Sequence, residues 1–326
     1  MNHFYSQDST ARIFPRPRVG ISQCLLGDPV RYDGRDKRSA WCTEQLSRIV
    51  DLIAFCPEVG SGLGVPRAPI HWITTKNGNR LVDVETQQLD FTEQLSRYYD
   101  DHRHPLAQLS GYVLMQKSPS CGLNVALYDT AGATGEYIVG AFAQALQQQL
   151  PYLPLVEEQA LATAVARDHF LVRVFALARW QQLFAHELTA KALQTFHSQY
   201  KYLLMAHSTA GYRTLGPLLA NLKAAPLADI ALQYRDILMD ALSQPASRGN
   251  TGNALQHISG YLRRHLSSTE RQALREHIEA FRRGESTYSQ PLALLQHYFQ
   301  RFPNAYIAQQ ALWQPYPAEL EQRHLF

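Results

Sequence analysis

Three cysteines each lie just beyond a short apolar run that predicts a β-strand, and this repeated pattern limits the folds open to the chain. The runs are residues 18–22, 52–55 and 111–115. The cysteines are Cys24, Cys56 and Cys121, each in or before a loop rich in Gly, Pro or Ser. In an open parallel sheet, ligands bind beyond the carboxyl ends of the strands. Thiols that are far apart in the sequence can therefore meet at one edge of such a sheet.

The segments between these strands predict helices. Residues 39–50, 89–109 and 140–149 fit crossover or flanking helices, and strands alternating with helices favour a mainly parallel α/β sheet. The second half has apolar residues at helical spacing only. Its predicted helices are residues 161–183, 187–205, 227–243, 252–266, 268–283 and 291–299. We therefore expect an α/β domain over residues 1–160 and an all-α domain over residues 161–326. Ser267 or Ser268 begins helix 268–283, with Ser268 as the expected cap and Glu270 in the first turn.

The cysteines have two interpretations. Free Cys often behaves as a small buried hydrophobic residue, and we interpret Cys42, in the predicted helix 39–50, in this way. The other three lack the paired spacing of a zinc ribbon or a redox dithiol. Three thiolates are one short of a closed tetrahedral site and leave a metal position open for chemistry. Ligands that are all thiolate favour iron–sulfur or zinc over hard cations, and the spacing does not separate these two.

The cysteine loops also carry acids, bases and hydroxyls. Glu58 follows Cys56 by two positions, and a carboxylate beside a metal thiolate is a candidate general base. Asp33 is a second candidate base. Ser118 and Ser120 precede the third cysteine, and their hydroxyls are expected to orient a substrate or relay a proton. Three further residues of these loops are expected to bind the substrate or neutralise charge: Arg31, Tyr32 and Lys117.

Four motifs of the first half together resemble the thiouracil desulfidase family. They are C-L-L-G-x-x-V-R-Y-D-G at 24–34, C-P-E-V-x-x-G-L-G-V-P-R at 56–67, R-L-V-D-V at 80–84 and K-S-P-S-C-G at 117–122. The resemblance covers about residues 18–150. It implies a [4Fe-4S] cluster held by Cys24, Cys56 and Cys121. The fourth iron would then be free to take the sulfur of the substrate.

The second half resembles the helical domain of unknown function DUF1722, through residues 196–219, 253–262 and 309–317. The fused architecture resembles bacterial desulfidases that act on 4-thiouridine in tRNA. This resemblance implies that tRNA containing 4-thiouridine is the partner and that the helical domain helps to hold it. The expected RNA contacts are Lys201, Tyr202 and Arg213, because aromatic and cationic side chains together can stack bases and meet phosphates.

The charge of the chain is uneven. Residues 1–165 hold 14 Lys and Arg against 17 Asp and Glu, whereas residues 166–326 hold 17 against 11. A basic half is a mild indication of a polyanionic partner. No apolar stretch approaches the roughly 20 residues of a membrane span, and the first residues lack the pattern of a signal peptide. We expect a cytoplasmic protein with neither a membrane nor an obligate protein partner.

These patterns and resemblances together predict an enzyme that replaces C=S by C=O in the 4-thiouridine of tRNA, without redox change and with release of sulfide. An iron of the cluster would act as Lewis acid on the substrate sulfur, and Glu58 would activate the attacking water. Two alternatives stay open. One is a desulfidase of free thiouracil or thiouridine monophosphate. The other is a non-catalytic RNA-binding or regulatory protein with a structural metal site, which Cys42 as a fourth ligand would favour.

Overall fold

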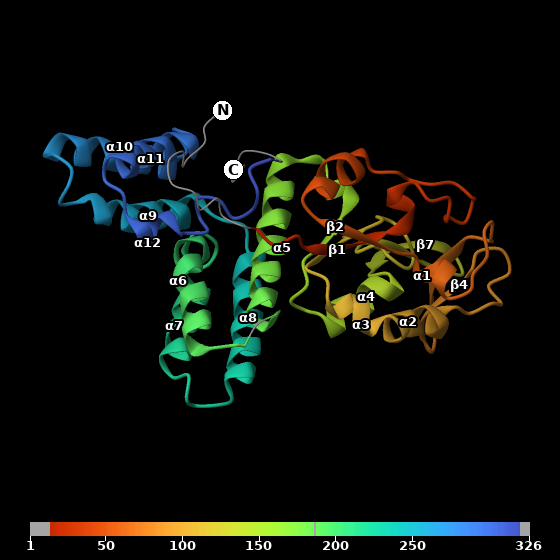
Figure 1. Ribbon diagram of the computed structural model, residues 1–326. Coiled ribbons are helices and arrows are strands. Elements are labelled where there is room, and N and C mark those ends of the chain that lie inside the picture. The colour runs from red at the N-terminus through yellow and green to blue at the C-terminus, as the bar shows by residue number, and fades with distance from the viewer. Residues whose placement is uncertain (1–13, 186, 320–326) are drawn as a thin grey trace. The chain divides into compact units, whose positions relative to one another are not determined.

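The computed structural model describes residues 14–185 and 187–319, which divide into two compact units. One unit is Arg16–Phe170, and the other runs from Leu171 onward and includes the described residues before Arg16. The division falls within the long helix α5 (Ala164–Ala185). Figure 1 shows strands in the first unit and helices throughout the second. This confirms the predicted fold class, an α/β region followed by an all-α region. Within the described residues, no helix is long and apolar enough to cross a membrane.

The first sheet of the α/β unit is entirely parallel. Its strands lie in the order β2 (Asp51–Phe55), β1 (Arg18–Ser22), β5 (Gly111–Leu114) and β8 (Leu155–Glu157). Both β1 and β5 are almost wholly buried, as expected of strands covered on both faces. The three strands predicted before the cysteines are thus neighbours. Their register pairs Ser22 with Phe55 and Ile21 with Val113, so their carboxyl ends lie together.

A second sheet was not predicted from the sequence. Its order is β4 (Gly78–Asp83), β3 (Ile70–Thr75), β6 (Val125–Asp129) and β7 (Gly132–Ile138). The pairs β3–β4 and β6–β7 are antiparallel hairpins, and the parallel pair β3–β6 joins them. Its buried face includes Trp72, Leu81 and Leu127, which pack in one cluster with Leu95 of helix α2.

The helices of the α/β unit differ in part from the prediction. The segment 89–109 is two helices, α2 (Thr92–Asp101) and α3 (Arg103–Ala107), and α4 (Ala141–Gln149) lies where a helix was expected. The segment 39–50 is a π-turn and a 3₁₀-turn, η2 (Trp41–Gln45) and η3 (Leu46–Arg48), rather than the amphipathic helix predicted. The amide of Leu46 is shared between the carbonyls of Trp41 and Cys42, which widens this turn. The remaining short turns are η1 (Gln23–Leu26), α1 (Pro57–Gly60) and η4 (Glu158–Ala162).

The second unit is built from helices that pack on their neighbours in sequence and in space (Figure 1). After α5 these are α6 (Ala190–His207), α7 (Thr209–Ala220), α8 (Leu227–Ser243), α9 (Arg248–Ser259), η5 (Gly260–Leu262), α10 (Ser268–Arg283), α11 (Ser289–Arg301) and α12 (Ala305–Ala308). In α8 the buried residues Ile230, Tyr234, Leu238 and Leu242 recur every four positions, which forms the apolar stripe of an amphipathic helix. The sequence did not predict α7 or α12 as separate helices.

The cap of α10 is Ser267, not Ser268 as predicted. The Ser267 hydroxyl accepts from the amide of Glu270 at 3.2 Å, and the Glu270 carboxylate accepts from the amide of Ser267 at 2.8 Å. This reciprocal pair is a capping box, which satisfies two amides at the start of the helix. The spacing of serine and glutamate by three positions selects Ser267.

Candidate active site

The three cysteines beyond β1, β2 and β5 lie close together, and we call them the cysteine site. Cys24 lies in the turn η1, Cys56 is the N-terminal cap of α1, and Cys121 lies in the loop after β5. Cys24 and Cys121 are buried, whereas Cys56 is partly exposed. Because their strands are adjacent in the first sheet, the loops converge on one edge, as the sequence predicted.

The pKa values of these thiols show that they act on one another. Burial raises the pKa of Cys24 to about 12, and the charge of Cys56 contributes to this rise. Burial also raises the pKa of Cys121, with added contributions from the charges of Glu58, Cys56 and Cys24 and an opposing hydrogen bond with Ser22. Burial raises the pKa of Cys56 as well, and Glu58 adds to it. Charges interact this way only at short range, so the three thiols and Glu58 share one neighbourhood.

The loop that carries Cys121 is held in place by hydrogen bonds that its backbone carbonyl groups accept from other elements. The indole Nε1 of Trp72 donates to the Pro119 carbonyl at 2.8 Å. The first amides of α4 donate to the same loop, with Phe142 N to the Ser120 carbonyl at 2.9 Å. These bonds satisfy amides at the start of a helix that have no partner inside it. The loop is therefore held by both a strand of the second sheet and a helix.

Glu58 lies beside the cysteine site with a different partner on each carboxylate oxygen. Its Oε2 accepts from Arg67 Nη2 at 2.5 Å, and both side chains of this ion pair are about nine-tenths buried, at 13% and 9% exposed. Its Oε1 accepts from the Ser120 hydroxyl at 2.5 Å and, more weakly, from the Ser118 hydroxyl at 3.5 Å. The Ser118 hydroxyl also accepts from the amide of Cys121 at 3.1 Å. The predicted base and both predicted serines are thus in one hydrogen-bonded group next to the thiols.

Arg67 is a residue of this site that the sequence reasoning missed. Besides its ion pair with Glu58, its guanidinium donates to the carbonyls of Val30 at 3.1 Å and Gly64 at 3.0 Å. Its backbone amide donates to the Tyr32 carbonyl at 2.9 Å. Arg67 therefore joins the first cysteine loop to the second. Its position as the last residue of the motif at 56–67 is the signal that could have found it.

Asp33, the second predicted base, is bonded to arginines rather than to the serine group. Its carboxylate accepts from Arg35 Nε at 2.8 Å and lies 3.7 Å from Arg31 Nη1. Burial favours the neutral form, but hydrogen bonds from the backbone and side chain of Arg35 and the charge of Arg31 outweigh it, so the pKa of Asp33 is lowered. Arg31 also lowers the pKa of Cys24, which places its charge near the cysteine site.

The other two predicted substrate-binding residues are accessible. Tyr32 is 41% exposed, with the Arg31 guanidinium 5.7 Å from its ring centroid. Lys117 is exposed and adopts a positive φ of 58° at the start of the third cysteine loop. Both are therefore available to a ligand from solvent.

Cys42 lies in a different environment. Burial raises the pKa of Cys42 to about 11, and its polar neighbours are Ser39 and Glu158. This is the packing role predicted for it, and it gives no support to Cys42 as a fourth ligand. In the described parts of the chain, no group of three or more His, Cys, Asp or Glu could hold a single metal ion.

The [4Fe-4S] cluster implied by the family resemblance fits the donors of the cysteine site. All three donors are thiols, which suit iron–sulfur clusters. Each cysteine of such a cluster ligates a different iron, so the three sulfurs need not converge on one point. Arg31 and Arg67 bring positive charge close to Cys24 and Cys56, where thiolates and the Glu58 carboxylate would otherwise repel one another. The residues that would hold the cluster are Cys24, Cys56 and Cys121.

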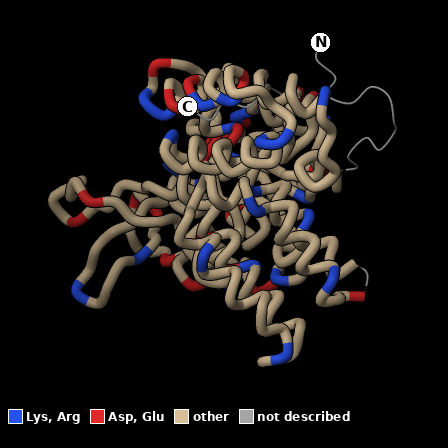
Figure 2. Tube along the Cα trace, turned by 90° about the vertical axis from the view of Figure 1, so that its left-hand side faces the viewer, with Lys and Arg blue, Asp and Glu red and all other residues tan. Residues whose placement is uncertain are grey.

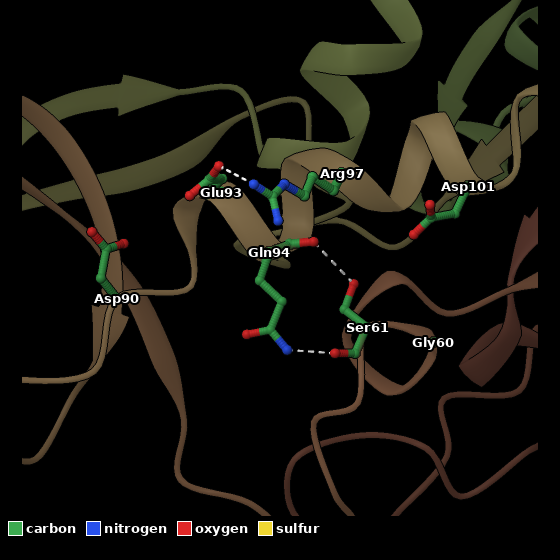
Figure 3. A pocket seen from close by; sticks show the side chains of 7 residues that line it. All are labelled: Gly60, Ser61, Asp90, Glu93, Gln94, Arg97 and Asp101. Carbon is green, nitrogen blue, oxygen red and sulfur yellow. Dashed lines mark hydrogen bonds and ion pairs between the residues drawn. The ribbon is translucent and has the colours of Figure 1, made fainter.

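A hollow of about 380 Å³ lies next to α1 but contains no cysteine. It is lined by Gly60, Ser61, Asp90, Glu93, Gln94, Arg97 and Asp101. Figure 3 shows the two hydrogen bonds between Ser61 and Gln94 and the ion pair between Glu93 and Arg97. A second hollow, of about 260 Å³, includes Arg67 and residues 62–64. The first hollow is a charged surface depression, whereas the second includes Arg67, the ion-pair partner of Glu58.

The predicted RNA-contact residues of the helical unit divide into two kinds. Tyr202 is only 1% exposed and packs in the core, so its ring is not available to stack on a base, which corrects the prediction for this residue. Lys201 lies partly exposed with its ammonium 5.2 Å from the Tyr202 ring, and Arg213 is exposed on α7. An exposed aromatic that the sequence reasoning missed is Tyr261, 39% exposed and stacked on Tyr306 at 5.7 Å. Figure 2 shows Lys and Arg spread over several helices.

Comparisons with known proteins match each half of the chain separately. The 2-thiouracil desulfurase family matches residues 19–158, and a protein family of unknown function, DUF1722, matches residues 201–317. The uncharacterized protein YbgA of Escherichia coli (strain K12) is 39% identical over 158 residues, which are 48% of this chain and 94% of that protein. A solved structure of a [4Fe-4S]-dependent thiouracil desulfidase, TudS, is 30% identical over 45% of this chain and 94% of its own, with a TM-score of 0.37.

Proposed function

We propose that the chain, which joins a region of the 2-thiouracil desulfurase family to a region of the DUF1722 family, removes sulfur from thiolated uracil. The observation that carries the proposal is the grouping of three thiols with an ion-paired carboxylate and two serine hydroxyls. The reaction is C=S plus water giving C=O plus hydrogen sulfide. Both products are at the oxidation level of the reactants, so no electron donor or acceptor is needed.

The proposed substrate is 4-thiouridine within tRNA. The support is the helical half, whose excess of six positive charges over negative ones suits a polyanion. Exposed Arg213 and partly exposed Lys201 are the proposed phosphate contacts, and Tyr261 offers an exposed aromatic face. A substrate as small as free thiouracil has no need of a second unit of this size.

The proposed cofactor is a [4Fe-4S] cluster held by Cys24, Cys56 and Cys121. When bound, it would supply an iron that takes the soft sulfur of the substrate and draws electron density from the carbon to be attacked. The three thiols must lose their protons as the cluster is inserted, because thiolates are the ligands.

The protein's own residues would then handle the water and its protons. Glu58 Oε1 is the oxygen that faces the serines, and it would take a proton from the attacking water directly or through the Ser120 hydroxyl. Arg67 holds Oε2 and so fixes the plane of the carboxylate. The proton taken by Glu58 and the second proton, which the added oxygen loses as C=O forms, would both pass to the departing sulfur, which leaves as hydrogen sulfide and restores the carboxylate. Arg31 and Lys117 would oppose the negative charge that develops on the pyrimidine.

The test is turnover by the full chain reconstituted anaerobically with iron and sulfide. We expect one sulfide released for each uridine formed from tRNA that carries 4-thiouridine, at a rate that an added reductant does not change. The Cys121→Ala variant, treated identically, is the control and should release none. Turnover of free 4-thiouridine with none on tRNA would favour the small-substrate alternative, and no turnover of any thiolated pyrimidine would contradict the proposal.

A further inference from the structure

Tyr112 is a buried residue of the cysteine site that the proposed reaction leaves unused. It lies in β5, the strand of the first sheet that leads to Cys121, and none of its surface is exposed. Its ring packs against Phe55 and Phe142, with centroid distances of 5.9 and 5.7 Å. The side chain is therefore fixed by aromatic contacts on more than one side.

The neighbouring strand makes room for this ring. Tyr112 pairs in register with Gly20 of β1, and a Cβ on Gly20 would lie 2.3 Å from a carbon of the Tyr112 ring. Any larger residue at position 20 would displace the ring, so the close approach requires glycine. These contacts explain the ring, but a phenylalanine would make all of them. The hydroxyl needs a separate explanation.

The Tyr112 hydroxyl has no hydrogen-bond partner among the described residues. A buried hydroxyl without a partner is unfavourable and uncommon. Tyr98, a second buried tyrosine near these cysteines, has a hydrogen bond with the backbone of Cys56. The difference between the two tyrosines indicates that the partner of Tyr112 is something other than protein.

The surroundings of the hydroxyl indicate what that partner is. Burial raises the pKa of Tyr112 well above its usual value, and the charges of Cys121, Cys56 and Cys24 add to this effect. The geometry agrees: Phe55, which packs on the ring, directly precedes Cys56, and β5 and its paired strand β1 lead to Cys121 and Cys24. The phenol therefore lies near the cysteine site. A tyrosine hydroxyl has one proton to donate, and sulfur atoms of a cluster and its thiolates accept hydrogen bonds.

We propose that the Tyr112 hydroxyl donates a hydrogen bond to a sulfur of the iron–sulfur cluster that Cys24, Cys56 and Cys121 hold. The inference rests on the cluster of the proposed function. Tyr112 is then a positioning residue that retains the cluster from its buried side, while the substrate approaches from the exposed side. Without this bond, the cluster is retained less well and is harder to reduce, because the bond offsets negative charge on sulfur.

The test compares Tyr112→Phe with the wild-type full chain in two states. Without cluster, the variant should melt at the same temperature as wild type or higher, because it lacks an unpartnered hydroxyl. With cluster, it should lose iron to a chelator about tenfold faster, the scale of one hydrogen bond to a charged group, and its reduction potential should be more negative. Tyr200→Phe, which alters a fully buried tyrosine of the helical unit, is the matched control. It should change neither the rate of iron loss nor the reduction potential.

The outcomes separate this inference from the proposed function. A loaded Tyr112→Phe protein with wild-type iron loss and potential would overturn the inference alone. A wild-type chain that binds no iron and sulfide would overturn both. Should the variant not fold, 3-fluorotyrosine at position 112 keeps the hydroxyl and makes it a stronger donor. The reduction potential should then rise above that of wild type, and an unchanged potential would again overturn the inference.

Discussion

The two carboxylate oxygens of Glu58 have different roles because they bind different partners. Oε2 is bound by the guanidinium of Arg67, and Oε1 accepts from Ser120. The first contact fixes orientation and balances charge, while the second leaves an oxygen in contact with a group that can exchange protons. A general base must lie within hydrogen-bond reach of the proton that it takes, directly or through one intervening group. Glu58 fits this condition better than Asp33, whose carboxylate is bound by Arg35 and Arg31.

The Glu58→Gln substitution tests this division directly. It preserves the shape of the side chain and removes its basicity. We expect cluster content near that of wild type, and turnover of 4-thiouridine reduced about 100-fold or more, the usual scale for a general base. Glu93→Gln, which changes an exposed carboxylate paired with Arg97, is the control and should retain activity. Turnover within a few-fold of wild type in Glu58→Gln would assign the base to Asp33 or a serine.

Substitution of the cysteines tests the ligand set. Alanine at position 24, 56 or 121 should each abolish cluster binding, because two thiolates hold a labile cluster poorly. Cys42→Ala should leave iron and sulfide content near normal, since Cys42 lies with Ser39 and Glu158. Cluster content of each variant is measured by counting iron and acid-labile sulfide and by the visible absorption spectrum. A colourless Cys42→Ala protein beside a coloured variant at any of the other three positions would show that the ligand set is wrong.

Single residues of the site differ in how far the sequence could predict them. The three cysteines were found because each follows a strand, and parallel strands bring their carboxyl ends together. Glu58, Ser118 and Ser120 were found because they are next to those cysteines in the sequence. Arg67 and Tyr112 are brought in by tertiary packing, one across loops and one across strands, and local sequence carries little sign of it.

Among the elements, the start of α10 shows how local chemistry sets a helix boundary. Ser267→Ala removes the hydroxyl that accepts from the Glu270 amide, and should reduce the free energy of unfolding by about 1 kcal/mol. Ser268→Ala, one position later, is the matched control and should change it by only a few tenths of that amount. Thermal or urea unfolding of the full chain followed by circular dichroism measures both. Equal reductions in the two variants would contradict the assignment of the cap.

The turn after β4 provides a prediction on pH. The Asp83 carboxylate accepts from the Thr86 hydroxyl, the Leu89 amide and the Thr86 amide, and these bonds lower its pKa to about 2. A folded pKa below the ordinary 3.8 means that Asp83 stabilises the fold above pH 3.8 and that this contribution is lost as pH falls toward 2. Asp83→Asn should therefore melt below wild type at pH 7, and this difference in melting temperature should narrow as pH falls from about 4 toward 2. A difference in melting temperature that stays the same at every pH would contradict this role of Asp83.

Among the helices and strands, those with long periodic apolar patterns could be predicted from the sequence. Those that depend on the geometry of a turn could not. The helices at 227–243 and 268–283 begin and end where their apolar spacing does. The second sheet was missed although Asn77 and Gly78, between alternating apolar residues, are a hairpin signal, with Gly78 at a φ of +108°. The π-turn at 41–45 depends on a shared amide that apolar periodicity does not reveal.

For the whole molecule, the uneven charge is the property that links the sequence to the proposed substrate. The alternation of strands and helices predicted the fold class, and a composition change at mid-chain accompanies the change of architecture. Which basic residues meet RNA could not be predicted so well, because burial decides which side chains reach solvent. Tyr202 shows this, since it lies between two candidate contacts in the prediction but has almost no exposed surface.

The double variant Lys201→Gln with Arg213→Gln, in the full chain, tests whether these two residues help to hold tRNA. Removing a phosphate contact reduces counterion release, so tRNA affinity should fall, and the slope of log affinity against log salt should become shallower by up to about two. Turnover of free 4-thiouridine and cluster content should not change, since both depend on the α/β unit. Arg97→Gln with Arg103→Gln, which removes two exposed charges from α2 and α3, is the charge-matched control. Affinity and salt dependence for tRNA equal to wild type in the first variant would exclude α6 and α7 from the RNA surface, and a larger decrease in the control would move that surface to the α/β unit.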